Sequence, residues 1–390
     1  MTARADPECI LIADDVTGAC DTGVQFARHG LSSEVWLDPT HVPSTLAQVV
    51  ALNTDSRCDD VTAAKAKIQQ IAGLYSDIKP GIILKKIDST LRGNVGQEIA
   101  ATMRYFRRDC AIISPAFPAM GRTARNGILE WKDCSGAGSV DIGELLQQQG
   151  IPSQRIVVTG VSTQGPTSVE VLLGNMNVNL GMLIVVDCTE QEDLGILVSS
   201  AYHLRQRLLW VGAAGLGMAL ARKLGNSTSK QSAILAKDAS VLFWIGSTHP
   251  VTQDQRDVLL KDSAGIEIVA EPGTLAIARR AIQEKRRLLL KIEREHATRH
   301  SLDAFLNGLK NLSVAGMLFT GGDTAMLVCN CLGAYAIRLV DEIAPGIPWG
   351  NLCGGSFDGL PVATKAGGFG DRDALLRCEE FFGSGREVMA

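Results

Sequence analysis

The sequence predicts an α/β protein made of two three-layer α/β/α domains, each built on a mostly parallel sheet. At 390 residues the chain is longer than one hydrophobic core usually serves. Short apolar runs alternate with longer amphipathic segments, a pattern typical of parallel strands with covering helices. A polar segment at 225–232, GNSTSKQS, interrupts the alternation and is the predicted linker. We therefore predict domains at 1–225 and 233–390.

The first half contains a series of short apolar runs with the character of buried strands. These runs are 10–13, 33–37, 49–53, 82–87, 110–114, 155–159, 182–187 and 207–211. Helical periodicity lies between them; for example, Val95 and Ile99 share one face of a helix predicted at 94–106. The first domain is therefore predicted to be a parallel sheet covered on both sides.

The second half repeats this alternation without repeating the sequence. Its predicted strands are 240–245, 266–270, 287–292, 316–320 and 335–339. This half is also α/β but separate, and its sheet is either parallel or mixed. Because open parallel sheets bind ligands beyond the carboxyl ends of their strands, we expect an active-site cleft between the two domains.

The composition excludes some classes of partner. A formal net charge of -4 gives no dominant basic face, so neither nucleic acid nor a membrane is expected as a partner, although a local Lys and Arg cluster can still bind a small anion. Acidic residues precede the first apolar run, no run reaches the length of a membrane span, and a cytoplasmic location is expected. The 10 cysteines show no repeated CxxC spacing and are expected to be mostly reduced core residues.

Polar residues gather where the predicted strands of the first half end. The run at 10–13 leads into Asp14 and Asp15, adjacent carboxylates that are costly to hold together unless a cation or a proton-carrying ligand compensates them. An alternative interpretation, equally well supported, makes Asp14 a helix N-cap and Asp15 a solvated acid of the first turn. The run at 49–53 is followed by Arg57.

The strand predicted at 82–87 ends in the densest set of charges, which comprises Lys85, Lys86, Asp88 and Arg92. Alternation puts Lys85 and Lys86 on opposite faces, so at most one of them points at a given ligand. The planar guanidinium of Arg92 is suited to clamping a carboxylate, although ordinary surface charges around a loop are the alternative. With the proline-bounded loop at 114–123, four strand ends of this character indicate one anionic, hydroxylated ligand.

Glycine and hydroxyl groups mark the strand ends of the second half. The run at 240–245 leads to Ser247, and the run at 316–320 leads into a GGDT motif made of Gly321, Gly322, Asp323 and Thr324. A further glycine loop near the end of the chain contains Gly367 and Gly368. Glycine lets backbone N–H groups approach phosphate oxygens, and a helix N-terminus adds partial positive charge. These loops are therefore predicted to hold a nucleotide. The sequence has no Walker A motif, no GxGxxG followed by an acidic residue and no protein-kinase signature, so the scaffold is a less common one.

Together these motifs resemble the four-carbon acid sugar kinase family, whose members phosphorylate threonate, erythronate or 3-oxo-tetronate with ATP. The matching stretches follow the family's order along nearly the whole chain: ADDVTGACD (13–21), NTDSR (53–57), KKIDSTLRGNVGQE (85–98), SPAFPAMGRT (114–123), VGAAGLGMALA (211–221), GSTHPVTQDQ (246–255), FTGGDTA (319–325) and GLPVATKAGGFG (359–370). The resemblance implies a sugar-acid-binding N-terminal domain and a nucleotide-binding C-terminal domain, in agreement with the two kinds of strand end.

The resemblance also implies roles for individual residues. The acid pocket would be lined by Asp14, Asp15, Arg57, Lys86, Asp88 and Arg92. ATP would be held by Ser247, Gly321, Gly322, Asp323, Thr324, Gly367 and Gly368. The chain departs from the family after Gly127, where ILEWKDCSGAGSVDIGELL is short and lacks the family's usual acidic, proline-bearing loop. The identity of the acid is therefore left open.

The expected reaction is in-line transfer of the γ-phosphoryl group of ATP to the terminal hydroxyl of the acid, with Mg²⁺ bridging the β- and γ-phosphates. Asp15, or failing that Asp14, would accept the hydroxyl proton. Arg92 and Lys86 would hold the substrate carboxylate or neutralise transferred charge. The metal ligands are left open, as is the choice between a monomer and a homo-oligomer.

Two other functions stay open at this point. A sugar-acid dehydrogenase would use the glycine loops for a dinucleotide, but the dinucleotide fingerprint is missing. A non-catalytic sensor of sugar acid and nucleotide would bind ligands without releasing ADP. The retention of every charged strand end disfavours the sensor.

Overall fold

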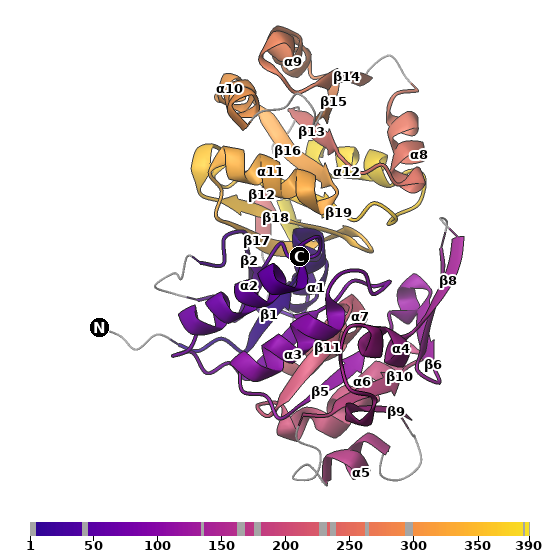
Figure 1. Ribbon diagram of the computed structural model, residues 1–390. Helices are drawn as coiled ribbons and strands as arrows, with labels where there is room; N and C mark the ends of the chain where they lie inside the picture. The colour runs from indigo at the N-terminus through magenta and orange to yellow at the C-terminus, as the bar shows by residue number, and fades with distance from the viewer. Residues whose placement is uncertain are drawn as a thin grey trace. The chain divides into compact units, whose positions relative to one another are not determined.

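The computed structural model describes residues 5–40, 46–133, 136–161, 168–174, 181–225, 232–234, 239–261, 265–292, 299–384 and 387–389 (Figure 1). The chain divides into two compact units, Met1–Ser33 with Asp38–Ser227 and Glu34–Leu37 with Thr228–Ala390. The linker predicted at 225–232 lies outside the described residues except for its two end positions. Among the described residues, no helix combines the length and the apolar character needed to cross a membrane.

The first unit is built on a parallel sheet with the strand order β3-β1-β4-β11-β5-β10-β9. The strands are β3 (Val49–Asn53), β1 (Cys9–Ala13), β4 (Ile82–Lys86), β11 (Leu208–Gly212), β5 (Cys110–Ser114), β10 (Leu183–Asp187) and β9 (Ile156–Gly160). Every residue of β1, β3, β4, β5 and β11 is buried, as the continuous apolar runs predicted.

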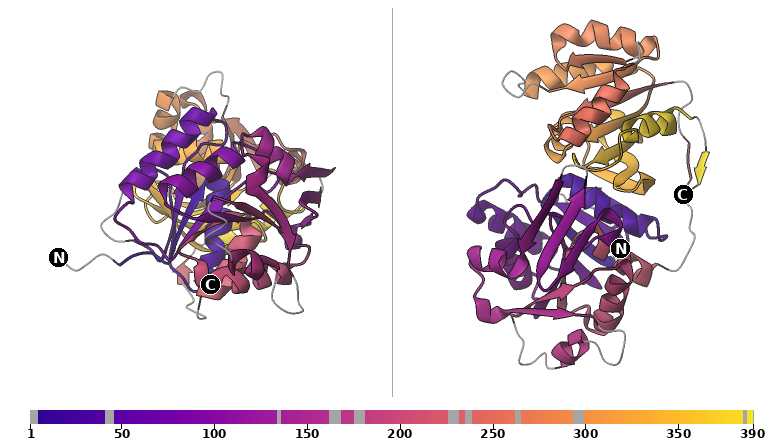
Figure 2. Two further views of the ribbon diagram at one scale, coloured as in Figure 1. Left: turned by 60° about the horizontal axis from the view of Figure 1, so that its bottom comes forward. Right: turned by 90° about the vertical axis from the view of Figure 1, so that its right-hand side faces the viewer.

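Helices cover both faces of this sheet (Figure 2). One group packs together and contains α1 (Val16–Ala27), α5 (Ser168–Gly174), α6 (Gln191–Ala201) and α7 (Ala214–Leu224). The other contains α2 (Val61–Leu74), α3 (Val95–Tyr105) and α4 (Ile142–Gln148). The predicted three-layer arrangement and the helix predicted at 94–106 are confirmed.

One strand predicted in the first half is differently placed. The run at 33–37 was expected as a buried parallel strand, but β2 (Ser33–Trp36) pairs antiparallel with β17 (Ala336–Ala344). Side chains reinforce the pairing, because Trp36 stacks on Tyr335 with ring centroids 5.3 Å apart and Arg338 Nε lies 3.0 Å from Glu34 Oε1. An apolar run alone does not specify its partner strand, which is why the sequence did not reveal this pairing.

A small antiparallel sheet in the first unit was not predicted. It consists of β6 (Arg122–Arg125), β7 (Ile128–Asp133) and β8 (Gly136–Asp141). A turn with positive φ at both Asn126 and Gly127 joins β6 to β7, and Asn-Gly is a strong hairpin signal. The segment that departs from the family pattern therefore forms part of this sheet and leads into α4.

The second unit has a mixed sheet with the strand order β14-β15-β13-β16-β19-β18-β17-β2. Parallel pairing joins β14 (Gly265–Val269), β15 (Arg287–Lys291), β13 (Ser240–Ile245), β16 (Val314–Thr320) and β19 (Pro361–Lys365). The remaining strands, β18 (Ile347–Cys353), β17 and β2, are antiparallel. Of the two sheet types left open by the sequence, the mixed one is found. A separate antiparallel pair joins β12 (Ser232–Ile234) to β20 (Glu387–Met389).

The helices of the second unit form two packed groups. One group is α8 (Pro250–Leu259) with α12 (Ala374–Gly383), and the other is α9 (Leu275–Gln283), α10 (Arg299–Leu309) and α11 (Gly322–Leu332). Phe243 and Leu318 of the sheet and Phe382 of α12 belong to one buried apolar core. Burial of this core holds the strands β13 and β16 in register, and the loops that follow them begin at fixed positions.

Candidate active site

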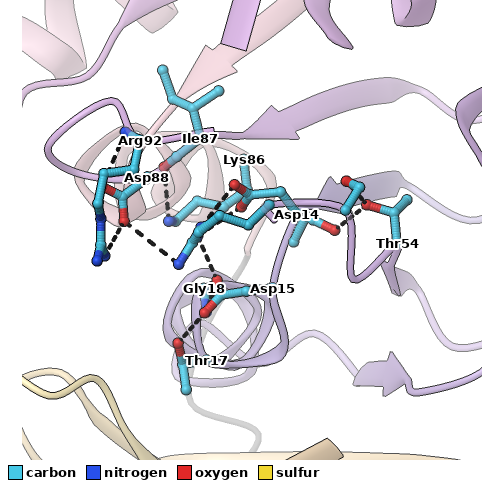
Figure 3. A network of polar contacts seen from close by, with 12 residues as sticks. Asp14, Asp15, Thr17, Gly18, Thr54, Lys86, Ile87, Asp88 and Arg92 are labelled. Carbon is cyan, nitrogen blue, oxygen red and sulfur yellow. Dashed lines mark hydrogen bonds and ion pairs between the residues drawn. The ribbon is translucent and has the colours of Figure 1, made fainter. Parts of the chain in front are cut away.

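A cluster of charged side chains lies at the carboxyl ends of three neighbouring strands of the first unit. Asp14 and Asp15 follow β1, and Asp88 and Arg92 follow β4 (Figure 3). Arg57 follows β3. Because β1 lies between β3 and β4 in a parallel sheet, these loops emerge side by side at one edge. The structure thus brings together five of the six predicted acid-site residues through direct contacts.

Arg57 is the cation that compensates the adjacent carboxylates. Its Nε and Nη2 donate to the two oxygens of Asp14 at 2.9 and 2.7 Å, and Nη2 also donates to Asp15 Oδ1 at 2.7 Å. Burial acts to raise the pKa of Asp14, but hydrogen bonds and charge from Arg57 outweigh burial and the pKa lies below its ordinary value. Asp14 is therefore held as a carboxylate.

Asp15 has a second task as the N-cap of α1. Its Oδ1 accepts a hydrogen bond from Gly18 N at 2.9 Å, and the hydroxyl of Thr17 donates to Oδ2. The alternative interpretation of this pair was thus wrong in detail, because Asp15 rather than Asp14 caps the helix. A carboxylate that caps a helix is also stabilised by the dipole at that end, so its position is well defined.

Asp88 and Arg92 form the other side of the cluster. Arg92 donates through Nε and Nη2 to the two oxygens of Asp88 at 3.0 and 2.7 Å, and Arg57 Nη1 lies 3.6 Å from Asp88 Oδ2. Burial acts to raise the pKa of Asp88, but the hydrogen bond from Arg92 and the charge of Arg57 hold it well below its usual range. The Arg92 side chain is 69% exposed, whereas that of Asp88 is only 7% exposed.

The two strand-ending lysines point to opposite faces, as alternation predicted. Lys85 Nζ lies 2.8 Å from Glu98 Oε2 of α3, and both side chains are buried. Lys86 Nζ donates to the carbonyl of Ile87 at 2.8 Å and lies beside α1, since a Cβ built on Gly18 would be 3.0 Å from it. Lys85 therefore lies on the α3 side of the sheet and Lys86 on the α1 side, and the charges of both lower the pKa of Asp14.

Sequence reasoning missed the buried network beneath this cluster. Glu98 Oε1 accepts a hydrogen bond from Ser56 Oγ at 2.8 Å, and the backbone N–H of Ser56 donates to the carbonyl of Asp14 at 3.0 Å. This ties the loop that carries Arg57 to both α3 and β1. The sequence did offer one signal: Lys85 stands in a strand predicted to be buried, so it required a carboxylate partner such as Glu98.

The fourth predicted strand end makes different contacts. Arg122 Nη1 donates to the carbonyl of Met120 at 2.8 Å, within its own loop. A direct role of this arginine in the acid cluster therefore stays a prediction.

Loops at three neighbouring strands form a second candidate site in the second unit. Ser247 follows β13, the GGDT residues 321–324 follow β16, and Gly367 and Gly368 follow β19. Gly246 N and Ser247 N donate to Thr320 Oγ1 at 3.1 and 3.4 Å, and Gly321 N donates to the carbonyl of Lys365 at 3.1 Å. These bonds join all three loops.

Glycine is required where these loops touch. A Cβ on Gly246 would lie 2.6 Å from Thr324 Cβ, and Gly321 has a φ of +93°. A Cβ on Gly367 would collide with Ser247 Oγ, and one on Gly368 would lie 3.2 Å from His249 Nε2. The predicted nucleotide-site residues therefore lie together, while His249 and the strand-ending Lys365 were not singled out by the sequence.

The expected magnesium ion would need carboxylate or other oxygen donors that are not already occupied. The described residues contain no group of three or more His, Cys, Asp or Glu side chains arranged to hold a metal ion. In the first unit, the carboxylates of Asp14, Asp15 and Asp88 are already bonded to arginines. These side chains do not form a metal site of their own, and we assign no catalytic step to Mg²⁺.

Comparison with known proteins agrees with the division into two sites. A family model described as a sugar-binding N-terminal domain matches residues 9–220, and one described as a nucleotide-binding C-terminal domain matches residues 269–375. A D-threonate kinase from Salmonella typhimurium is 32% identical over 96% of this chain and 99% of its own length. A D-erythronate kinase from Heliobacterium modesticaldum is 26% identical over 95% of this chain and 96% of its own.

Solved structures share the fold. A Salmonella typhimurium protein aligns with a TM-score of 0.76 at 19% identity, covering 97% of this chain and all of that one. A Haemophilus influenzae protein aligns with a TM-score of 0.70 at 20% identity, covering 96% and 100% of the two chains. The two domain matches and the 32% identity over nearly the whole chain show that the chain belongs to the four-carbon acid sugar kinase family.

Proposed function

We propose that this protein transfers the γ-phosphoryl group of ATP to the terminal hydroxyl of a four-carbon sugar acid of the threonate, erythronate or 3-oxo-tetronate class. One observation supports this most directly: the sugar-binding unit holds carboxylates beside an exposed arginine, while the nucleotide-binding unit offers glycine loops. Curated relatives over nearly the full length act on these acids according to their names.

Arg92 is the proposed anchor for the substrate carboxylate. Two of its nitrogens are bound by Asp88, which fixes the guanidinium plane, and its side chain is the most exposed of the cluster. A planar guanidinium fixed in this way can present its remaining N–H donors to a second carboxylate. Lys86, on the α1 side of the strand, is proposed to neutralise charge near the reacting hydroxyl.

Asp15 is the proposed acceptor of the hydroxyl proton. Asp14 has both oxygens taken by the Arg57 fork, and its lowered pKa makes it a weaker base. Asp15 meets Arg57 through one oxygen only, while its other oxygen accepts from the neutral hydroxyl of Thr17, and its side chain is 12% exposed against 6% for Asp14. The N-cap bond to Gly18 orients Asp15, which suits a residue that must receive a proton along one direction.

ATP is proposed to bind at the second site. Its phosphates would contact backbone N–H groups of the loops containing Ser247, Gly321, Gly322, Asp323, Thr324, Gly367 and Gly368. Mg²⁺ is proposed to arrive with ATP, held by the phosphates and by water, because this ion keeps several of its waters when it binds. When bound, it would neutralise phosphate charge.

The test is ADP release with Mg²⁺ and ATP across a panel of D-threonate, D-erythronate, L-threonate and 3-oxo-tetronate. We expect ADP release that depends on one or more of these acids, with a phosphorylated acid formed in equal amount. Ligand binding without acid-dependent ADP release would contradict the proposal and favour a sensor. The comparison of the four acids identifies the substrate and its stereochemistry.

A further inference from the structure

Lys365 ends strand β19 and is completely buried beneath the glycine loop that follows it. Its ammonium group donates to the carbonyls of Ala366, Gly367 and Phe369 at 3.1, 3.3 and 2.9 Å, and to Thr252 Oγ1 at 3.2 Å. These four acceptors are uncharged oxygens. The lysine therefore gathers the carbonyls of the loop onto one positive charge.

Two side chains of α8 act on the same carbonyls. Thr252 Oγ1 donates to the carbonyl of Gly367 at 2.8 Å. Gln255 Nε2 donates to the carbonyls of Phe369 and Gly370 at 3.1 Å each, and to that of Asp371 at 2.7 Å. Lys365, Thr252 and Gln255 therefore hold five carbonyl groups of this loop, those of residues 366, 367 and 369–371.

The inward carbonyls determine where the amide groups point. No cis peptide bond occurs among the described residues, so each N–H points away from the carbonyl of the preceding residue. The N–H groups of Gly367 and Gly368, which share peptide planes with the carbonyls of Ala366 and Gly367, therefore point away from Lys365. Within the described part of the chain, neither N–H donates a hydrogen bond to another protein group.

We propose that Lys365 is a positioning residue for phosphate binding: by holding the carbonyls of Ala366, Gly367 and Phe369 inward, it turns the N–H groups of Gly367 and Gly368 toward the phosphates of the nucleotide. The proposal rests on the proposed ATP-dependent function and adds to it. The lysine acts through the loop and does not itself touch the ligand.

Neighbouring residues support this orientation of the N–H groups of Gly367 and Gly368. Gly367 packs against Ser247 and Gly368 against His249, both in the β13–α8 loop, so the two amides lie next to another predicted phosphate-binding loop. Side chains larger than hydrogen would not fit at Gly367, because a Cβ there collides with Ser247 Oγ. The amides and the second loop can therefore contact the same ligand.

The test compares Lys365→Met with Lys291→Met. Lys291 also ends a strand of this sheet, β15, but it is partly exposed and pairs with Glu267 at 2.9 Å. Binding of ATP, AMP and adenosine is measured by calorimetry for both variants and for the unaltered protein. For Lys365→Met we expect the Kd for ATP to rise about 10- to 100-fold, with a smaller change for AMP and none for adenosine. For Lys291→Met all three Kd values should change by less than about twofold.

The outcomes distinguish failure of the Lys365 proposal from failure of the proposed ATP-dependent function. If the unaltered protein fails to bind ATP, the proposed function fails and the inference with it. If the unaltered protein binds ATP and Lys365→Met binds it equally well, only the inference fails. An equal loss of affinity for ATP and adenosine would also overturn it, because that result indicates general collapse of the site.

A second measurement covers the case in which Lys365→Met does not fold. In the unaltered protein, titration with inorganic triphosphate should shift the backbone amide NMR signals of Gly367 and Gly368, whereas unchanged signals would overturn the proposal. Thr252→Val keeps the side-chain shape but removes the hydroxyl shared by Lys365 and Gly367, so it should weaken ATP binding by about threefold to tenfold without affecting adenosine. No effect on ATP binding would contradict the inference.

Discussion

The two candidate sites both follow the carboxyl ends of parallel strands, yet they are built from different groups. In the first unit, charged side chains hold one another, as Arg57 does with Asp14 and Asp15. In the second, close-packed glycine loops present backbone groups, with Gly246 against Thr324 and Gly367 against Ser247. Fixed side-chain charges suit a small acid with several hydroxyls, whereas backbone amides suit the spread charge of phosphates.

The buried lysines extend the comparison. Lys85 in the first unit meets a carboxylate, Glu98, while Lys365 in the second meets carbonyl oxygens. The first arrangement is a neutral pair that fixes the position of a loop. In the second, the ammonium group binds backbone carbonyls of the loop that follows the strand. Each buried lysine therefore fixes a loop at the end of a parallel strand, through a carboxylate in the first unit and through backbone carbonyls in the second.

The largest expected effect is on the first site, in Asp15→Asn. Asn keeps the N-cap of α1 but removes the proton acceptor, so kcat should fall by about 10²- to 10⁴-fold while the Kd for ATP stays within about twofold. The matched control is Asp60→Asn, which makes the same change at the N-cap of α2 and should leave kcat unaltered. Steady-state ADP release measures kcat for both variants. Unchanged turnover in Asp15→Asn would refute its role and make Asp14 the candidate.

The second-largest effect is expected for Gly246→Ala, which alters ATP binding at the second site. The added Cβ would lie within 2.6 Å of Thr324 Cβ, and overpacking of about 1–3 kcal/mol should raise the Kd for ATP roughly tenfold or more. The affinity for the sugar acid should not change. Gly383→Ala, where a Cβ meets nothing within 4 Å, is the control and should bind ATP normally. If calorimetry shows that Gly246→Ala loses equal affinity for ATP and for the sugar acid, the assignment of these ligands to separate sites is contradicted.

A smaller effect is expected in Arg92→Met. Loss of one charge-assisted contact should raise the KM for the sugar acid about tenfold, with little change in the KM for ATP. Arg92→Lys keeps the charge but not the planar fork, and should recover only part of the loss. The control is Arg104→Met, which removes an exposed arginine of α3. An unchanged KM for the acid in Arg92→Met would show that the carboxylate binds elsewhere.

The smallest effect concerns stability and pH. The pKa of Asp88 is lowered in the folded chain, so the unfolded chain binds the proton more readily. Its stabilising contribution is therefore present above about pH 4 and is lost as the pH falls below that value. Asp88→Asn should flatten the decline in the free energy of unfolding between about pH 5 and pH 3, measured by urea titration. Asp77→Asn, at an exposed position of the same unit, should keep the decline of the unaltered protein. Parallel curves for all three proteins would contradict the assignment.

Much of the fold follows from local sequence. The apolar runs at 49–53, 110–114 and 240–245 coincide with β3, β5 and β13, because a strand buried on both faces must be apolar throughout. The hairpin at Asn126 and Gly127 was also readable, since both residues favour positive φ, but β6 is polar and only 4 residues long, and the hairpin was missed.

Local sequence alone determined that charged groups follow β1, β3 and β4 and that glycine loops follow β13, β16 and β19, because the ends of strands are set by where apolar runs stop. Only tertiary structure decided that Arg57 reaches both Asp14 and Asp15, that β2 pairs with β17, and that Lys365 meets four neutral oxygens. Such contacts join residues far apart in the chain, and their formation depends on the register and spacing of whole strands, which no short segment encodes.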